Sequence, residues 1–278
     1  MFSFCEILDN PPPVIHIVDA GAAAYGVDPY DNLSRQGLCH VVGFEPNRED
    51  CEKRNATRMT NHIYLPYALG DGRERRFFLC NNPLTSSFYK PNSALLDKFS
   101  NLEPGIRVVS EFDIQTRRLD DLSEIQDVDY LKLDVQGAEL DVLNGAERLL
   151  TATLLVHTEV EFIPMYIDQP LFGDIDVALR RKDFWLHKLN GLTGRVMKPL
   201  VPRNDPFAPL SQLLWADAAI YTKSFMHFDR LSPEKLLKLA IILHDVYASW
   251  DLCALAIRHY DDKTGKKLWQ AYLDKLAS

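Results

Sequence analysis

A lysine and an aspartate interrupt an otherwise apolar run at residues 130–135, where a buried strand is expected. Alternate side chains of a strand point to one face, so Tyr130, Lys132 and Asp134 share a side. Burying either charge without a partner costs on the order of several kcal/mol. These groups therefore either form an internal ion pair that fixes the strand, or Asp134 emerges into a cleft at the strand's carboxyl end, where open α/β sheets bind ligands.

A second expected strand, residues 153–161, places His157, Glu159 and Glu161 on one face. A poor nucleophile such as a hydroxyl needs a positioned base, and carboxylates and imidazoles are the usual ones. These three side chains and Asp134 are therefore the candidate bases. We place His157 second because histidines more often pack than act as bases. Carboxylate oxygens also suit Mg²⁺, which is the less favoured alternative.

A third set of residues indicates a nucleoside cofactor. The first expected strand ends in Asp19 and Gly21, and the second ends in Glu45. A glycine lets the backbone approach a ligand closely, and a carboxylate at the second strand's end can accept both hydroxyl protons of an adenosine ribose. The dinucleotide fingerprint needs a glycine where this chain has Ala23. An acid at the first strand's end suits a cationic amino-acid moiety better than a pyrophosphate, which favours S-adenosylmethionine over NAD.

The elements that must position these residues alternate between strands and helices, which predicts a parallel, doubly wound sheet. Residues 75–113 are expected to be irregular, with short strands at 76–79 and 106–109. Pro66 inside the third strand indicates an edge position or a bulge. The expected core strands are 14–19, 39–45, 62–69, 130–134, 153–161, 184–189 and 215–221, and the expected helices include 137–150 and 170–182.

The pattern changes after Lys223. Ser232, Pro233 and Glu234 form a good helix start. The following residues carry an apolar stripe at helical spacing, which must be buried on the first domain or in a homodimer contact. We therefore predict two parts: a domain at residues 1–223 and a helical extension at 224–278.

Composition narrows the class of protein. The chain has 278 residues, of which 46% are hydrophobic and 25% charged, and its net charge of −8 disfavours nucleic acid as a partner. No apolar run approaches the length of a membrane span. The first residues have no basic region ahead of an apolar core, so we expect no signal peptide and a cytoplasmic location. The 5 cysteines are scattered, as is typical of reduced thiols, and no metal-binding spacing is present.

On these residues the chain resembles the FkbM-type class I S-adenosylmethionine-dependent methyltransferases. The resemblance covers about residues 14–222 and is most specific in its last segment. Gln136 stands where family members usually carry Glu. The matching segments are Val18-Asp19-Ala20-Gly21-Ala22, Gly43-Phe44-Glu45-Pro46-Asn47, Ala68-Leu69-Gly70-Asp71, Thr85-Ser86-Ser87 and Lys132-Leu133-Asp134-Val135-Gln136-Gly137-Ala138-Glu139.

The resemblance implies a Rossmann-like seven-stranded sheet with the last strand antiparallel, and a cofactor above strands one, two and four. Asp19 and Gly21 would face the methionine part, Glu45 the ribose, and residues 68–70 the adenine. The full set of implied cofactor-binding residues is Asp19, Gly21, Ala22, Tyr25, Glu45, Pro46, Asn47, Ala68, Leu69, Gly70 and Asp134.

The resemblance also implies O-methylation, often of a sugar hydroxyl on a glycan or natural product. In this sheet order the fourth and fifth strands are neighbours, so we expect Lys132 to pair with Glu159 or Glu161. The candidate catalytic residues are Asp134, Glu159, Glu161, Lys132 and His157, and the candidate substrate-binding residues are Ser86, Ser87, Gln136 and Tyr166. A methyltransferase-like binding module without turnover, or a nucleotide-sugar or NAD enzyme on a similar fold, are the alternatives.

Overall fold

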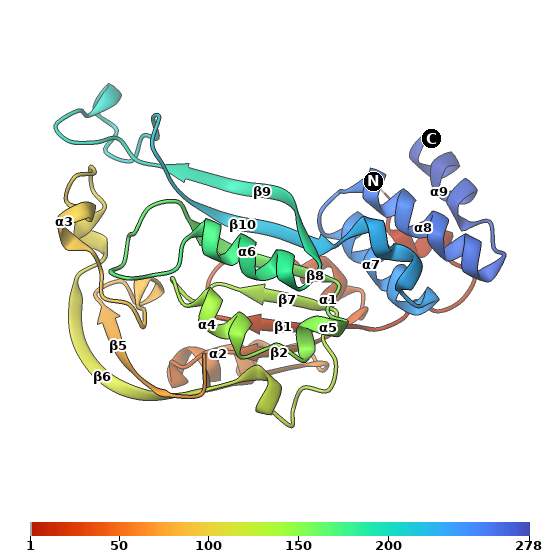
Figure 1. Ribbon diagram of the computed structural model, residues 1–278, viewed down its shortest axis with the longest axis horizontal. Helices are drawn as coiled ribbons and strands as arrows, with labels where there is room; N and C mark the ends of the chain where they lie inside the picture. The colour runs from red at the N-terminus through yellow and green to blue at the C-terminus, as the bar shows by residue number, and fades with distance from the viewer. Residues whose placement is uncertain (1) are drawn as a thin grey trace.

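The computed structural model describes residues 2–278, and its centre is a seven-stranded sheet with the order β3-β2-β1-β7-β8-β10-β9 (Figure 1). β10 is antiparallel to both of its neighbours, and the other pairings are parallel. This is the predicted fold class. The strands are β1 (Ile15–Ala20), β2 (Cys39–Phe44), β3 (His62–Leu65), β7 (Tyr130–Leu133), β8 (Leu155–Glu161), β9 (Phe184–Gly194) and β10 (Leu213–Lys223).

Short helices connect these strands. The start of α2 is fixed by Asn47, whose side chain accepts hydrogen bonds from the backbone N–H groups of Glu49 and Asp50. The single helix expected at 137–150 is wrong, because the chain forms two short helices that are separated at Gly145. The carbonyl of Gly145 accepts from the N–H of Asp120 at 2.9 Å instead of continuing a helix. The helices are α1 (Asp31–Arg35), α2 (Arg48–Thr57), α4 (Glu139–Asn144), α5 (Leu149–Ala152) and α6 (Phe172–Arg181).

A second, three-stranded sheet has the order β4-β6-β5. Its strands are β4 (Ala68–Leu69), β5 (Glu74–Cys80) and β6 (Val108–Arg117). The short strand expected at 76–79 lies within β5, and the one expected at 106–109 overlaps the start of β6. The expectation that the rest of 75–113 is irregular is wrong for β5 and β6, which form a long antiparallel pair. The strand expected at 62–69 is divided around Pro66, which has no N–H to donate to a ladder, and β3 lies at the edge of the main sheet.

The C-terminal part consists of α7 (Pro233–Asp245), α8 (Trp250–Thr264) and α9 (Leu268–Leu276). As predicted, Ser232 caps α7 by accepting from the N–H of Lys235. The apolar stripe of α7 and α8 is buried in one cluster with Ile15, Ile17 and Leu155 of the main sheet. The extension therefore packs on the sheet, which is one of the two arrangements that the sequence predicted. The domain boundary near residue 223 stays a prediction.

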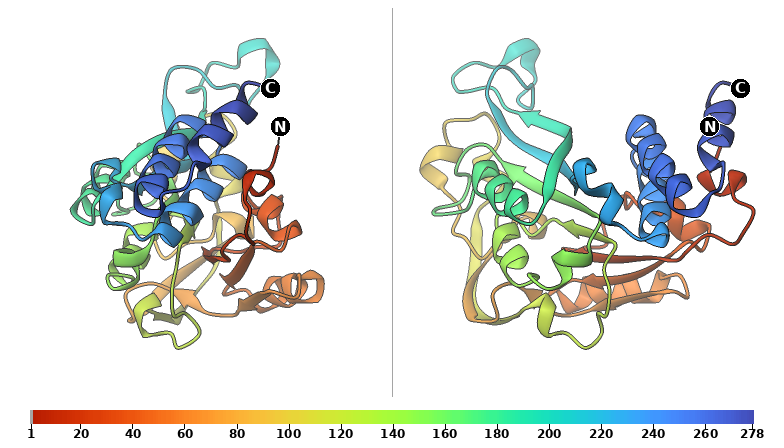
Figure 2. Two further views of the ribbon diagram at one scale, coloured as in Figure 1. Left: turned by 90° about the vertical axis from the view of Figure 1, so that its right-hand side faces the viewer. Right: turned by 45° about the vertical axis from the view of Figure 1, so that its right-hand side comes forward.

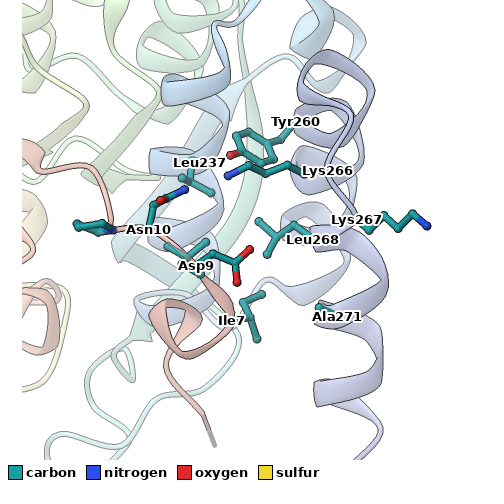
Figure 3. Close-up of a pocket in the computed structure, with 11 residues that line it drawn as sticks. Ile7, Asp9, Asn10, Leu237, Tyr260, Lys266, Lys267, Leu268 and Ala271 are labelled. Carbon is teal, nitrogen blue, oxygen red and sulfur yellow. The ribbon is translucent and has the colours of Figure 1, made fainter.

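The extension lies beyond the amino ends of β1 and β7, on the side opposite to the arrowheads, and both chain ends lie beside it (Figures 1 and 2). A pocket of about 360 Å³ separates the segment around Asp9 from α8 and α9 (Figure 3). It is remote from the carboxyl ends of the strands, where the candidate bases lie. No helix within residues 2–278 is long and apolar enough to cross a bilayer.

Candidate active site

A cleft of about 920 Å³ opens at the carboxyl ends of β1, β2, β7 and β8. It forms beside the point where the strand order reverses between β1 and β7, which is the usual ligand site of such sheets. The predicted site residues that line it are Gly21, Tyr25, Glu45, Pro46, Asn47, Ala68, Leu69, Ser86, Lys132, Asp134, Gln136, Glu159, Glu161 and Tyr166. Asp19, Ala22, Gly70, Ser87 and His157 are not among the lining residues.

Lys132 lies in the floor of the cleft and pairs with Asp19 at 2.9 Å. The expected pairing with Glu159 or Glu161 is wrong, because the register places Asp19 and His157 directly beside Lys132. The other oxygen of Asp19 accepts from the hydroxyl of Tyr30 at 2.6 Å. Burial alone would lower the pKa of Lys132, but Asp19 and then Asp134 raise it above its ordinary value. The ammonium therefore neutralises a fully buried aspartate.

Asp134 emerges from the end of β7, and its side chain is 48% exposed. The backbone N–H of Asp134 donates to the carbonyl of Ala20 at 3.0 Å, which joins the ends of β1 and β7. Gly21 permits this contact, since a Cβ there would lie 1.8 Å from the carbonyl oxygen of Asp134. A glycine is therefore needed at position 21 because the ends of β1 and β7 approach each other closely. The sequence alone did not reveal this reason.

Gln136 connects the candidate bases. Its amide Nε2 donates to Asp134 at 3.1 Å and to Glu159 at 2.7 Å. The hydroxyl of Tyr166 donates to the Gln136 side-chain oxygen at 3.2 Å. Ser87 is buried and donates to the Gln136 carbonyl, so it holds the loop rather than facing the cleft. The site residues of β7, β8 and the following loops thus form one hydrogen-bonded network.

Three glutamates carry carboxyls that are hard to ionise. Burial, followed by Asp134, raises the pKa of Glu159 well above its usual range. Burial, followed by Glu139, does the same for Glu161, whose Oε2 is buried without a hydrogen-bond partner. Glu139 accepts from the N–H of Val135 at 2.8 Å, and burial raises its pKa to about 7. Burial therefore favours the protonated form of all three carboxyls, and two of them, Glu159 and Glu161, line the cleft.

Glu45 lies at the end of β2, where the sequence placed it. It is 8% exposed, and one carboxylate oxygen accepts from the N–H of Asn47 at 2.8 Å. Burial raises the pKa of Glu45 to about 7, and the backbone hydrogen bond from Asn47 only partly offsets this effect. Its other oxygen is left for a ligand.

Comparison with known proteins is consistent with this arrangement. The family model for the methyltransferase FkbM domain matches residues 19–186. The chain belongs to the FkbM methyltransferase family. It is 40% identical over 180 residues to the 2-O-methyltransferase NoeI of Sinorhizobium fredii (strain NBRC 101917 / NGR234), and the match covers 60% of this chain and 68% of that protein.

Two solved structures are similar at a low level. One is a proposed methyltransferase from Thermoplasma acidophilum, with a TM-score of 0.39 and 8% identity. That match covers 77% of this chain and 70% of the Thermoplasma chain. The plantazolicin methyltransferase BpumL in complex with SAH has a TM-score of 0.37 and 8% identity, and covers 79% of each chain.

His157 of this methyltransferase lies below the cleft. Its Nδ1 lies 3.2 Å from the hydroxyl of Tyr130 and 2.9 Å from that of Tyr247, which follows α7. Burial, followed by Lys132, lowers the pKa of His157 to about 4, so the imidazole is neutral at physiological pH. It therefore belongs to a hydroxyl network that joins the sheet to the C-terminal extension.

Within residues 2–278, one group of side chains has metal-ligand spacing, and it lies at the opposite end of the sheet. It comprises His16, Asp127 and Asp129. Lys235 lies within 2.9 Å of both aspartates, and Lys238 lies 2.9 Å from Asp129. These lysines already balance the carboxylate charge, so the group ties α7 to the sheet.

Among the residues that line the cleft of the methyltransferase and that sequence reasoning missed are Arg195, Trp215 and Asp217. The signal for Asp217 was available, because this charge interrupts an otherwise apolar stretch of its strand, as Lys132 and Asp134 do in theirs. Arg195 had no signal, since it lies in the long connection from β9 to β10.

Proposed function

We propose that this protein is an S-adenosylmethionine-dependent O-methyltransferase that acts on a sugar hydroxyl of a glycan or natural product. The observation that carries the proposal is one cleft faced by a buried acid at the end of β2, the open carboxylate of Asp134 at the end of β7, and the carboxyls of Glu159 and Glu161 on β8, whose pKa values burial raises. The 40% identity to a 2-O-methyltransferase supports the choice of oxygen as the methyl acceptor.

The residues present fit the cofactor. Glu45 has a carboxylate oxygen available for the ribose hydroxyls, and Pro46, Ala68 and Leu69 supply apolar surface for the adenine beside it. Asp134 offers negative charge near the expected position of the sulfonium. When bound, S-adenosylmethionine supplies an activated methyl group for in-line transfer to an oxygen.

The role of Asp19 is indirect in this proposal. Its carboxylate is fully buried and engaged by Lys132 and Tyr30, so it holds the floor of the cofactor site rather than contacting the methionine part. Lys132, unlike Asp19, lines the cleft, so its side chain is the part of this floor that faces the ligand.

For proton transfer we assign Asp134 as the general base. It is the carboxylate at the end of β7 that remains open to the cleft, and the amide of Gln136 orients it. The carboxylate of Asp134 would accept the acceptor's hydroxyl proton, while the cofactor would supply the methyl group and, with its methyl carbon–sulfur bond broken, leave as S-adenosylhomocysteine. Glu159, which shares the same amide, is the second candidate.

The test has two stages. Isothermal titration with S-adenosylhomocysteine and with NAD should show binding of the first and not of the second. Labelled S-adenosylmethionine should then transfer its methyl group to one or more members of a panel of methyl glycosides of hexoses, deoxyhexoses and N-acetylhexosamines. Tight NAD binding without a response to S-adenosylhomocysteine would overturn the cofactor assignment, and a bound cofactor with no transfer to any glycoside would overturn the acceptor class.

A further inference from the structure

Asp217 is aimed into the cleft by a bulge in β10. Ala216 pairs with Val160, but the next pair joins Ala219 to Thr158. Asp217 and Ala218 therefore stand opposite a single residue of β8, which is Glu159. A bulge of this kind re-aims a side chain at the cost of ladder hydrogen bonds, and bulges are common beside active sites.

The carboxylate of Asp217 is held from two sides. Trp215 Nε1 donates to its Oδ1 at 2.7 Å. Gly191 of β9 leaves room for the side chain, because a Cβ there would lie 2.3 Å from Oδ2. The backbone at Gly191 has φ +65°, a conformation that L side chains rarely adopt. Both the space and the orientation of Asp217 are thus built into the β9–β10 pair.

The C-terminal extension supports this region from below. The hydroxyls of Tyr130 and Tyr247 lie 2.6 Å apart, and both contact His157. A backbone hydrogen bond with Asp217 raises the pKa of His157 and so opposes the lowering that burial causes. Lys188 of β9 donates to the carbonyl of Tyr247 at 2.8 Å. The two strands that carry Gly191 and Asp217 are therefore anchored on the extension.

The position of the Asp217 carboxylate in the cleft does not stabilise the fold. Asp217 is exposed and lines the same cleft as the carboxylates of Asp134 and Glu159. Burial raises the pKa of Asp217, the hydrogen bond from Trp215 opposes this effect, and the charge of Asp134 adds to it. A strand side chain that places like charges near one another destabilises the fold unless a ligand compensates for it. A polyhydroxylated ligand does so, because each hydroxyl can donate to a carboxylate oxygen.

We propose, on the basis of the O-methyltransferase function inferred above, that Asp217 is an acceptor-binding residue that accepts a hydrogen bond from a hydroxyl adjacent to the one that is methylated. Asp217 stands opposite Glu159 in the ladder and lines the same cleft as Asp134, the assigned base, so the acceptor is a vicinal diol or polyol. Arg195, whose guanidinium lies 5.5 Å from the Trp215 ring centroid and 5.7 Å from that of Phe207, forms the outer rim of this subsite.

The experiment measures binding of the methyl glycoside panel to protein saturated with S-adenosylhomocysteine, by saturation-transfer NMR. Asp217→Asn should bind S-adenosylhomocysteine as the wild type does, but should bind the glycoside ~10- to 100-fold more weakly, as expected for the loss of a charge-assisted hydrogen bond. Glu111→Gln, which removes an exposed carboxylate of β6 away from the cleft, is the matched control and should change neither affinity.

Asp217→Glu, which keeps the charge but displaces the carboxylate, gives a second test if the asparagine variant is unstable, and it should also weaken glycoside binding. Unchanged glycoside affinity in a folded Asp217 variant would overturn the role of Asp217 alone. A wild-type protein that binds S-adenosylhomocysteine but no glycoside would overturn both this role and the proposed acceptor class.

Discussion

At the scale of single residues, Lys132 serves two carboxylates with different needs. Asp19 is fully buried and depends on the ammonium 2.9 Å away, whereas Asp134 stands 4.0 Å from it and remains open to the cleft. The Lys132 ammonium therefore neutralises the buried Asp19 carboxylate, and the Asp134 carboxylate remains available for proton transfer. The two aspartates should respond to mutation in opposite ways.

Replacing Asp134 should remove activity without removing the fold. Asp134→Asn keeps the shape of the side chain and cannot accept the acceptor's proton, so we expect methyl transfer to fall by about 10²- to 10⁴-fold. The melting temperature and the affinity for S-adenosylhomocysteine should change little. Full turnover by this variant would transfer the role of base to Glu159 or Glu161.

Replacing Lys132 should instead destabilise the protein. Lys132→Ala leaves the buried Asp19 carboxylate with only the Tyr30 hydroxyl, and breaking a buried pair costs about 3–5 kcal/mol. Urea unfolding measures this loss, with Lys53→Ala as the control because Lys53 forms only exposed pairs on α2. The double variant Lys132→Met with Asp19→Asn should recover part of the stability. Equal effects of the Lys132 and Lys53 changes would contradict the pairing.

Glu45 should make cofactor binding depend on pH. Its pKa of about 7 lies above the unfolded value, so the folded protein holds an extra proton between those two values, and ionisation as the pH rises destabilises the ligand-free fold. The ionised carboxylate accepts ribose hydroxyls better, so affinity for S-adenosylhomocysteine should rise from about pH 6 to about pH 8. Glu45→Gln should remove this rise, and its stability relative to the wild type should increase as the pH rises from 4.5 to about 7. A wild-type affinity that is flat with pH would refute this assignment.

At the scale of elements, the sequence predicted the strands that local residue patterns define. It did not predict the side-chain pairs that depend on the register between two strands. Alternation and β-branched runs located β1, β7 and β8, and the polar breaks in β7 and β8 marked the cleft. The pairing of Lys132 with Asp19 required knowing which residues of β1 and β7 face each other, and a one-residue shift in register would change the answer. The bulge at Asp217 left no local signal because it is a property of two strands together. Only residues 76–79 of β5 were expected as a strand, because charged and aromatic residues share both of its faces and hide its full length.

The C-terminal extension should be required for a soluble sheet. Truncation after Lys223 removes the helices that cover Ile15, Ile17 and Leu155, which would then expose apolar side chains to water. We expect the truncated protein to aggregate or to self-associate, as measured by light scattering after gel filtration. A truncated protein that stays monodisperse, with unchanged mass and stability, would show that the sheet folds without the extension.

At the scale of the whole molecule, the sheet and the extension share one apolar cluster and one ion-pair group, so they should unfold together. The cluster joins α7 and α8 to β1, and Lys235 and Lys238 join α7 to the aspartates ahead of β7. The 4 tryptophans supply local probes, since Trp215 lies in the cleft and Trp269 lies in α9. Variants that retain a single tryptophan, either Trp215 or Trp269, should show the same thermal midpoint. S-adenosylhomocysteine should raise both midpoints equally, although it binds far from α9. A Trp269 midpoint that is lower, and that the ligand leaves in place, would mean that the extension is an independent domain docked on the methyltransferase.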